Sequence, residues 1–280
     1  MRKAPVNKII SFSNVDGPGN RTSIFFQGCP FNCRFCHNPE TINLCENCGL
    51  CVDKCPARAL SRDGDGRVRW DPSLCVQCDS CIRVCPHDAS PRVRYMTVEE
   101  VLHEIRRAAP YIGGITVSGG ECTLQNDFLL ELFPLVRQMG KTCLLDSNGS
   151  FDFEKDPRIL AVSDGVMLDV KAVSPAWHEH LIGAKRDTVL KNLDYLLSVG
   201  KLQEVRTVIL PGRDEENEVT VRYVAGRIGS ACGYKIIRYR PFGVREKYQK
   251  ELGEFTVEEE YAERYAALAR SLGASQAYVV

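Results

Sequence analysis

Three cysteines, at positions 29, 33 and 36, stand in one short stretch, FFQGCPFNCRFCHNPET (25–41), which contains no fourth cysteine. A structural zinc site uses four protein ligands, whereas a metal site that does chemistry keeps one position open for water or substrate. The spacing C-x3-C-x2-C therefore predicts a catalytic metal centre with one ligand that this loop does not supply.

Eight further cysteines lie in two copies of one phrase. CENCGLCVDKCP (45–56) and CVQCDSCIRVCP (75–86) share the spacing C-x2-C-x2-C-x3-C-P and are offset by 30 residues. This is the bacterial ferredoxin run, in which the fourth cysteine of each copy ligates the 4Fe–4S cluster of the other copy. The predicted ligand sets are Cys45, Cys48, Cys51 and Cys85 for one cluster, and Cys75, Cys78, Cys81 and Cys55 for the other.

A pair of zinc ribbons is the alternative interpretation of these two copies, because C-x2-C occurs in both kinds of site. The third cysteine and the Cys-Pro step, present in both copies, favour iron–sulfur clusters. The remaining thiols, Cys122, Cys143 and Cys232, are scattered in the sequence, and we expect them to be buried and inert.

Charge and hydropathy exclude several classes of function. Lys plus Arg equals Asp plus Glu at 36 each, so no basic field attracts nucleic acid or an anionic membrane. No apolar run reaches the roughly 18 residues of a membrane span, and the first residues lack the apolar core of an export signal. We expect a cytoplasmic protein with reduced, metal-binding thiols, no nucleic acid partner and no membrane partner.

The rest of the chain alternates β-rich runs with helical stretches. Near-continuous Val, Ile and Leu predicts strands that are buried on both faces, as in parallel sheets. The expected strands are 21–28, 113–120, 142–149, 165–172, 204–212 and 234–242, and helices are expected at 97–109, 126–140, 188–200 and 255–273. The first of these helices opens with a capping box from Thr97 to Glu100. Six β-α units indicate an α/β barrel or open barrel with its helices outside.

Candidate site residues follow the predicted strands. In such barrels the chemistry sits at the carboxyl ends of the strands, so these residues should converge on one rim. The residues in question are Cys29, Ser118 to Glu121, Asp146 to Asn148, Asp169 to Lys171, Pro211 to Gly212 and Pro241 to Phe242. Between the two cysteine copies, Val68 and Trp70 suggest a small hairpin.

The motifs resemble those of a known family. The spacing CPFNCRFC (29–36) is similar to the signature of radical S-adenosylmethionine (SAM) enzymes. DGPGNR (16–21) and CHNPET (36–41) resemble the activating enzymes of glycyl radical enzymes, the pyruvate formate-lyase activase group, with the YjjW type nearest among members that carry an insertion. The resemblance implies a partial (β/α)6 radical SAM barrel at 1–41 and 93–280, with a ferredoxin-like domain holding two 4Fe–4S clusters inserted at 42–92.

The resemblance also supplies the missing ligand of the cysteine loop. SAM would bind the unique iron of a third 4Fe–4S cluster, on Cys29, Cys33 and Cys36, through its amino and carboxylate groups. Gly119 and Gly120 would permit close backbone approach, and Glu121 would accept a hydrogen bond from the SAM amino group. Phe35 is either a neighbour of the adenine or a core aromatic, and the sequence leaves both open.

Further roles come from the same resemblance. Asp169 and Lys171, which lie two apart on a strand and so point to one side, would serve the SAM carboxylate and a monovalent cation. A surface ion pair is the alternative for them, as a structural ion pair is for Arg206, which matches a family arginine near SAM. The other positions that match the cation site are Asp146, Ser147 and Met167. Two departures are Gly243, where the family often has histidine, and Cys122, where proline or alanine is usual.

The expected function is therefore a SAM-dependent activase. It would cleave SAM reductively and abstract a hydrogen from a glycine of a partner glycyl radical enzyme, with the three loop cysteines and Lys171 as catalytic residues and a flavodoxin- or ferredoxin-type reductant as electron donor. A radical SAM enzyme that acts on a small molecule is the alternative, and an electron-carrying polyferredoxin is a third, which leaves the barrel and Glu121 unexplained. The insert clusters could relay electrons or dock the partner.

Overall fold

The computed structural model describes residues 2–280, and its main feature is one nine-stranded sheet in the order β11-β10-β9-β8-β7-β6-β2-β1-β5. The strands are β1 (Lys3–Ser13), β2 (Arg21–Phe26), β5 (Arg94–Thr97), β6 (Gly114–Gly119), β7 (Thr142–Ser147), β8 (Gly165–Asp169), β9 (Leu202–Ile209), β10 (Gly233–Arg238) and β11 (Ala277–Val279). Neighbours from β2 to β11 pair in parallel, whereas β1 is antiparallel to β2 and β5. Because β5 and β11 each have a single neighbour, the sheet is an open barrel.

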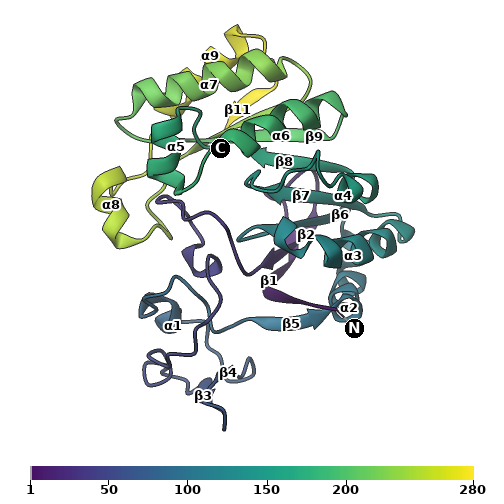
Figure 1. Cartoon of the computed structure of the whole chain (residues 1–280), viewed down its shortest axis with the longest axis vertical. Coiled ribbons are helices and arrows are strands. Elements are labelled where there is room, and N and C mark those ends of the chain that lie inside the picture. The colour runs from purple at the N-terminus through teal and green to yellow at the C-terminus, as the bar shows by residue number, and fades with distance from the viewer. Residues whose placement is uncertain (1) are drawn as a thin grey trace.

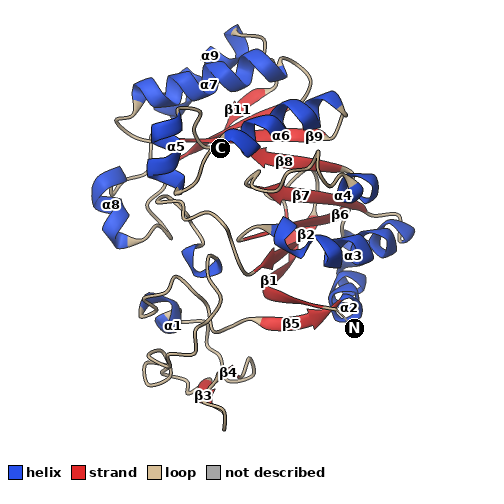
Figure 2. Ribbon diagram, in the orientation of Figure 1, coloured by secondary structure: helices blue, strands red, loops and turns tan. Residues whose placement is uncertain are grey.

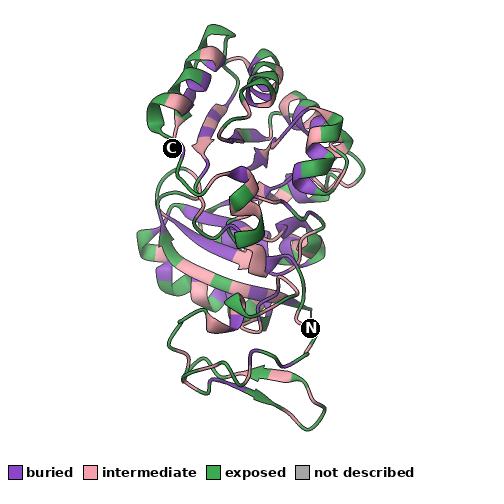
Figure 3. Ribbon diagram, turned by 90° about the vertical axis from the view of Figure 1, so that its left-hand side faces the viewer, coloured by how far each residue is buried: buried purple, intermediate pink, exposed green. Residues whose placement is uncertain are grey.

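All six predicted parallel strands are present, and their residues explain why. In β6, β7 and β8 most side chains are buried, as expected for apolar strands that are covered on both faces. Figure 3 shows this buried layer at the centre of the molecule. Since all six strands run in one direction, their carboxyl ends lie at one rim of the barrel.

Most of the helices cover the outer face of the sheet, whereas α8 lies apart from the strands (Figure 2). They are α2 (Val98–Ala108), α3 (Asn126–Gln138), α4 (Arg158–Val162), α5 (Pro175–Ile182), α6 (Asp187–Ser198), α7 (Asp214–Ile228), α8 (Glu246–Leu252) and α9 (Glu259–Ser271), with short 3-10 turns η1 (Pro39–Thr41), η2 (Ala109–Tyr111) and η3 (Cys122–Gln125). The predicted capping box is confirmed, because Thr97 accepts from the Glu100 N–H and the Glu100 carboxylate accepts from the Thr97 N–H. Helix α3 ends just before Gly140, whose φ is +71°.

Three strands were not predicted from the sequence. Strand β1 mixes charged, polar and apolar residues, and much of it is exposed, so it lacks the continuous apolar character of the parallel strands. Strand β5 has four residues and β11 has three, too short for a periodic signal. These strands extend the sheet beyond the six β-α units without adding to the rim.

The segment 42–92 projects away from the barrel, beyond β5 (Figure 1). It contains the predicted hairpin, formed by β3 (Leu60–Arg62) and β4 (Val68–Trp70), and the short helix α1 (Ser80–Arg83). Its buried apolar cluster is separate from the main core and consists of Cys51, Leu60 and Cys81, with partly buried neighbours around them. Within residues 2–280 no helix has both the length and the apolar character needed to cross a membrane.

Candidate active site and cysteine clusters

The loop with Cys29, Cys33 and Cys36 follows β2 and is fixed by backbone hydrogen bonds at both ends. The Cys29 N–H donates to the Ile42 carbonyl (2.8 Å), and the Arg34 N–H donates to the Leu181 carbonyl (2.8 Å) at the end of α5. Burial raises the pKa of Cys29 to about 12 and also raises the pKa values of Cys33 and Cys36. Because these three thiols lie near one another and ionise with difficulty, they fit a metal cluster, whose positive charge would deprotonate them.

Gly119 and Gly120 allow close approach, but of the protein's own backbone. A Cβ on Gly119, whose φ is +117°, would lie 2.2 Å from the Phe26 nitrogen. A Cβ on Gly120 would lie 2.1 Å from the Gly28 carbonyl oxygen. These glycines therefore let β6 pass directly beside the start of the cysteine loop, which brings Glu121 next to that loop.

The Glu121 carboxylate is buried, with 1% of the residue exposed. Its Oε1 accepts from Thr123 and from the Ser147 hydroxyl (2.9 Å), and its Oε2 accepts from the Asn148 N–H (2.8 Å). Burial raises the pKa of Glu121, although these donors oppose the shift. Because Oε2 has one protein donor, it keeps the capacity to accept one more, which is the capacity that a bound amino group would need.

Lys171 and Asp169 form an ion pair at the end of β8, and the pair is largely buried. Burial lowers the pKa of Lys171, but the Asp169 carboxylate outweighs burial and raises it, with a further contribution from Cys33. Lys171 is therefore a fixed positive charge beside the cysteine loop. The alternative, a surface ion pair, is wrong for these two residues, because both side chains are largely buried.

Arg206 lies among the residues expected to hold a monovalent cation. Its guanidinium donates to Asp146 Oδ1 (2.9 Å), to Glu204 Oε1 (2.6 Å) and to the Met167 sulfur (3.0 Å). The Ser147 hydroxyl instead points to Glu121, as expected for neighbours on a strand whose side chains alternate between faces. The side chains therefore fit a bound cation poorly, because Arg206 already neutralises Asp146 and Lys171 already neutralises Asp169.

Phe35 is 5% exposed and belongs to the main apolar core. Of its two interpretations, the core aromatic is the one that its surroundings favour. His37, two residues on, instead reaches a cleft of ≈ 840 Å³ that extends along Met167 and Arg206 to the loop 14–18. A cleft of this size is in the range that holds a small molecule or an extended peptide segment.

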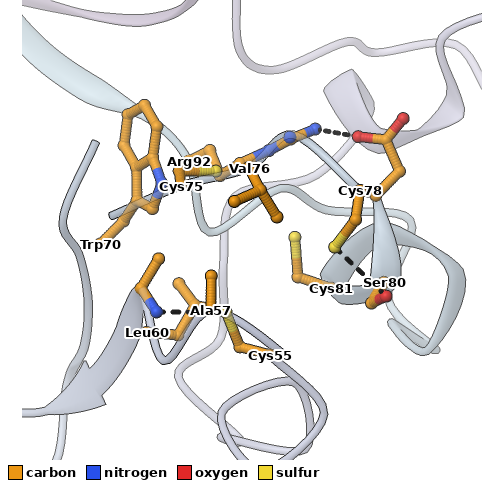
Figure 4. A pocket seen from close by; sticks show the side chains of 12 residues that line it. Cys55, Ala57, Leu60, Trp70, Cys75, Val76, Cys78, Ser80, Cys81 and Arg92 are labelled. Carbon is orange, nitrogen blue, oxygen red and sulfur yellow. Dashed lines mark hydrogen bonds and ion pairs between the residues drawn. The ribbon is translucent and has the colours of Figure 1, made fainter. Parts of the chain in front are cut away.

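Four of the eight repeat cysteines, Cys55, Cys75, Cys78 and Cys81, line one pocket (Figure 4). These are the four that the ferredoxin spacing assigns to one cluster. In the other predicted set, Cys51 lies near Cys45 and Cys85, and burial followed by the charge of Cys45 raises the pKa of Cys51 to about 11. Within residues 2–280 no group of three or more His, Cys, Asp or Glu side chains is arranged to hold a single metal ion.

The backbone of the two cysteine copies repeats as well. Positive φ values occur at Asn47 (60°), Gly49 (80°) and Arg58 (51°), and again 30 residues later at Gln77 (54°), Asp79 (59°) and Asp88 (48°). Left-handed residues between right-handed ones turn successive N–H groups toward one point, a geometry that is typical of Fe–S sites. The repeat in sequence is therefore a repeat in local structure.

Two residues near the loop were not assigned a role from the sequence. Asn148, which stands in the run after β7, donates its N–H to Glu121 and its side-chain amide to the Cys29 sulfur (3.4 Å). Arg245 precedes α8, and its guanidinium donates to Asn32 Oδ1 (2.6 Å), Asp88 Oδ2 (2.6 Å) and the Cys33 carbonyl (2.8 Å). No local sequence pattern indicated a role for Arg245, because its hydrogen-bond partners are more than 150 residues away in the sequence.

Comparison with known proteins agrees with this geometry. The family model of the radical SAM superfamily matches residues 23–224. The chain is 33% identical over 240 residues to the indoleacetate decarboxylase activating enzyme of Tractidigestivibacter scatoligenes, covering 77% of this chain and 76% of that protein. It is 31% identical over 260 residues to the pyruvate formate-lyase-activating enzyme of Streptococcus mutans, covering 89% and 81%.

A further relative is the isethionate sulfite-lyase activating enzyme of Nitratidesulfovibrio vulgaris, 29% identical over 286 residues, with 93% of each chain covered. Among solved structures, Streptococcus suis SuiB bound to S-adenosylmethionine has a TM-score of 0.57 at 13% identity, covering 90% of this chain and 47% of that one. This structural likeness supports the fold alone.

Proposed function

The chain belongs to the radical SAM superfamily and, within it, to the activating enzymes of glycyl radical enzymes, and on this premise we propose that it activates a partner glycyl radical enzyme. The observation that carries the proposal is the loop of three mutually close cysteines beside the buried pair Lys171–Asp169 at the carboxyl rim of the barrel. When bound, the 4Fe–4S cluster and SAM supply a reductive cleavage whose radical product abstracts a hydrogen from a glycine of the partner.

The residues of the rim then have separate roles. Cys29, Cys33 and Cys36 would hold the cluster through their thiolates, which leaves one iron open for SAM. Lys171 holds a positive charge beside the loop, where a carboxylate would be stabilised, and Glu121 Oε2 accepts from an amino group. Arg206 and Asp146 form a largely buried ion pair beside these residues. Burial of these groups keeps water from the reacting atoms.

The proposal extends to the segment 42–92 as a ferredoxin-like domain with two further 4Fe–4S clusters, which makes three in total. The common pocket of Cys55, Cys75, Cys78 and Cys81 and the repeated left-handed backbone support it. The electron donor would be a flavodoxin- or ferredoxin-type protein, and the protein would act in the cytoplasm. The monovalent cation that the resemblance implies has no role in this proposal, because Arg206 and Lys171 already pair with its expected carboxylates.

The test uses the glycyl radical enzyme encoded nearest to this chain in its genome. We expect the reconstituted chain to form 5′-deoxyadenosine, measured by chromatography, and a glycyl radical on the partner, measured by electron paramagnetic resonance. Cys33→Ala should abolish both and leave about eight of about twelve irons. Cys143→Ala is the matched control, because it removes a fully buried thiol that is not part of any cysteine cluster.

The outcomes separate the alternatives. SAM cleavage that persists in Cys33→Ala would place the active site elsewhere. Cleavage in the native chain without a glycyl radical on the partner would favour a small-molecule substrate instead.

A second experiment concerns the two insert clusters. We propose that they relay electrons to the site cluster, so replacing Cys75, Cys78 and Cys81 by alanine should slow SAM cleavage by a protein donor even without the partner. If the insert only docks the partner, cleavage without the partner stays normal and glycyl radical formation falls. Undiminished cleavage with a protein donor would refute the relay.

A further inference from the structure

The pocket of Cys55, Cys75, Cys78 and Cys81 has a second layer of polar groups. Figure 4 shows Trp70 and Arg92 beside Cys75 at the same pocket. The Trp70 indole N–H is buried and has no hydrogen-bond partner within residues 2–280. A buried N–H group without a partner is rare, because leaving it unpaired costs free energy, so it indicates a missing acceptor.

The missing acceptor is identified by what lies around the indole. Trp70 and Arg92 line the same pocket as Cys75 and Cys81, so their N–H groups lie where a bound cluster would sit. Sulfur atoms of a bound cluster would fill this pocket and accept both donors.

Arg92 has a counterpart in the first cysteine copy, and the two arginines behave differently. Arg62 precedes Arg92 by 30 residues, the offset of the repeat. It lies across Gly49, so that a Cβ there would be 1.8 Å from its guanidinium, and it donates to the carbonyls of Cys48 and Gly66 (2.9 Å). In the second copy Asp79 replaces Gly49, and its carboxylate holds Arg92 by an ion pair of 2.6 Å.

The difference between Gly49 and Asp79 gives the guanidinium groups of Arg62 and Arg92 different hydrogen-bond partners. With glycine at position 49, the Arg62 guanidinium lies over the backbone and donates its hydrogen bonds to carbonyl oxygens. With aspartate at position 79, Arg92 is held at the cysteine pocket. N–H groups that bond to sulfur stabilise the reduced state of a 4Fe–4S cluster, because reduction adds negative charge to its sulfur atoms.

We propose that Trp70 and Arg92 donate N–H groups to the sulfur atoms of the cluster held by Cys55, Cys75, Cys78 and Cys81, and thereby give it a higher reduction potential than the other insert cluster. The inference rests on the proposed function, in that it requires two clusters in the insert. The two insert clusters would then differ in reduction potential, so electrons would move preferentially from one cluster to the other.

The direction agrees with the position of this pocket. Helix α1, which carries Cys81, lies on the barrel side of the β3–β4 hairpin (Figure 1). An electron that enters the insert from a protein donor would therefore collect on the cluster held by Cys55, Cys75, Cys78 and Cys81.

The test is a redox titration of the reconstituted full chain, followed by electron paramagnetic resonance. Arg92→Gln should lower the reduction equilibrium constant of one insert cluster by about tenfold, which is about 59 mV for one electron. Trp70→Phe keeps the ring, removes the N–H and should shift the same cluster in the same direction. Arg62→Gln is the matched control, because it removes the repeat-equivalent charge from a site that faces carbonyls, and should leave both potentials unchanged.

The outcomes distinguish this inference from the proposed function. Unchanged potentials in Trp70→Phe and Arg92→Gln chains that hold about twelve irons would overturn the inference and leave the function intact. If Arg92→Gln fails to load iron, Trp70→Phe decides alone, with an unshifted potential overturning the inference. A native chain that holds only about four irons would overturn both the inference and the two-cluster insert, while SAM cleavage would still test the function separately.

Discussion

Arg245 links the segment before α8 to the active-site loop and to the end of the segment 42–92. Replacing it should remove the hydrogen bonds that hold these three parts together. Its guanidinium contacts the active-site loop at Asn32 and Cys33, and it contacts Asp88, which follows the last repeat cysteine by three residues. The arginine side chain is 8% exposed and that of Asp88 is 25% exposed. Arg245→Met keeps the aliphatic stem but leaves the Asp88 carboxylate and the Cys33 carbonyl without this donor.

The size of the effect follows from the exposure of the partners. Removing one partner of a fully buried ion pair costs about 3–5 kcal/mol. Because Asp88 is a quarter exposed, water can replace part of the lost interaction, and we expect a loss of about 2 kcal/mol in the free energy of unfolding. For a chain of this size that corresponds to a melting temperature lower by roughly 4–8 °C.

Two measurements check this prediction. Thermal unfolding of the cluster-loaded chain gives the melting temperature, and amide hydrogen exchange shows where protection is lost, which should be at residues 29–36 and 85–92. Asp88→Asn should give a smaller loss, because asparagine still accepts the hydrogen bond and tolerates the positive φ of 48°. Arg240→Met, which removes an exposed arginine of the same segment, should change neither quantity. Native exchange rates at both segments in Arg245→Met would refute the role of this junction.

Three further predictions follow from particular contacts. His178 is buried, and burial lowers its pKa, so its contribution to stability is present above its ordinary pKa of about 6.5 and is lost as the pH falls through the lowered value. In His178→Gln the free energy of unfolding should therefore fall less between pH 7 and pH 5 than in the native chain. Gly120→Ala should destabilise the chain by more than about 3 kcal/mol, because its Cβ would overlap the Gly28 carbonyl at 2.1 Å, and the yield of soluble, iron-loaded protein should drop. Because Arg206 neutralises Asp146, exchanging potassium for tetramethylammonium should change the SAM dissociation constant by less than about twofold; a tenfold loss in calorimetry would show that Arg206 leaves Asp146 when SAM binds.

The parallel strands and the cysteine groups were predictable because their signals are local. A run of apolar residues specifies a strand buried on both faces, and cysteine spacing specifies a loop that can surround a cluster. Strand direction places Glu121, Asp169 and Lys171 at the rim, as expected from the sequence, and their roles toward SAM stay predictions. Strand β1 was missed because charged and polar residues interrupt its apolar ones, which gives no continuous apolar run.

Contacts between distant segments were not predictable in the same way. Arg206 was recognised as a candidate, but its pairing with Asp146 and Glu204 depends on the register of β7, β8 and β9, which no local pattern reveals. The roles of Gly119 and Gly120 were only half predicted, because the backbone that approaches them belongs to β2 and its following loop rather than to a ligand. Asn148 was visible in a run of polar residues, yet its two donors became assignable only once Cys29 and Glu121 were placed.

The small apolar core of the segment 42–92 gives a physical reason to expect bound groups inside the segment. Its buried apolar cluster contains only Cys51, Leu60 and Cys81, and segments this small usually require a metal or disulfides to stay folded. Its backbone also holds five non-glycine residues at positive φ, a conformation that costs about 1–2 kcal/mol each and persists only where the surroundings enforce it. Two clusters bound by eight cysteines would supply both the missing core and that enforcement. On the proposed function the repeat would hold two clusters, and the change from Gly49 to Asp79 would distinguish one half from the other.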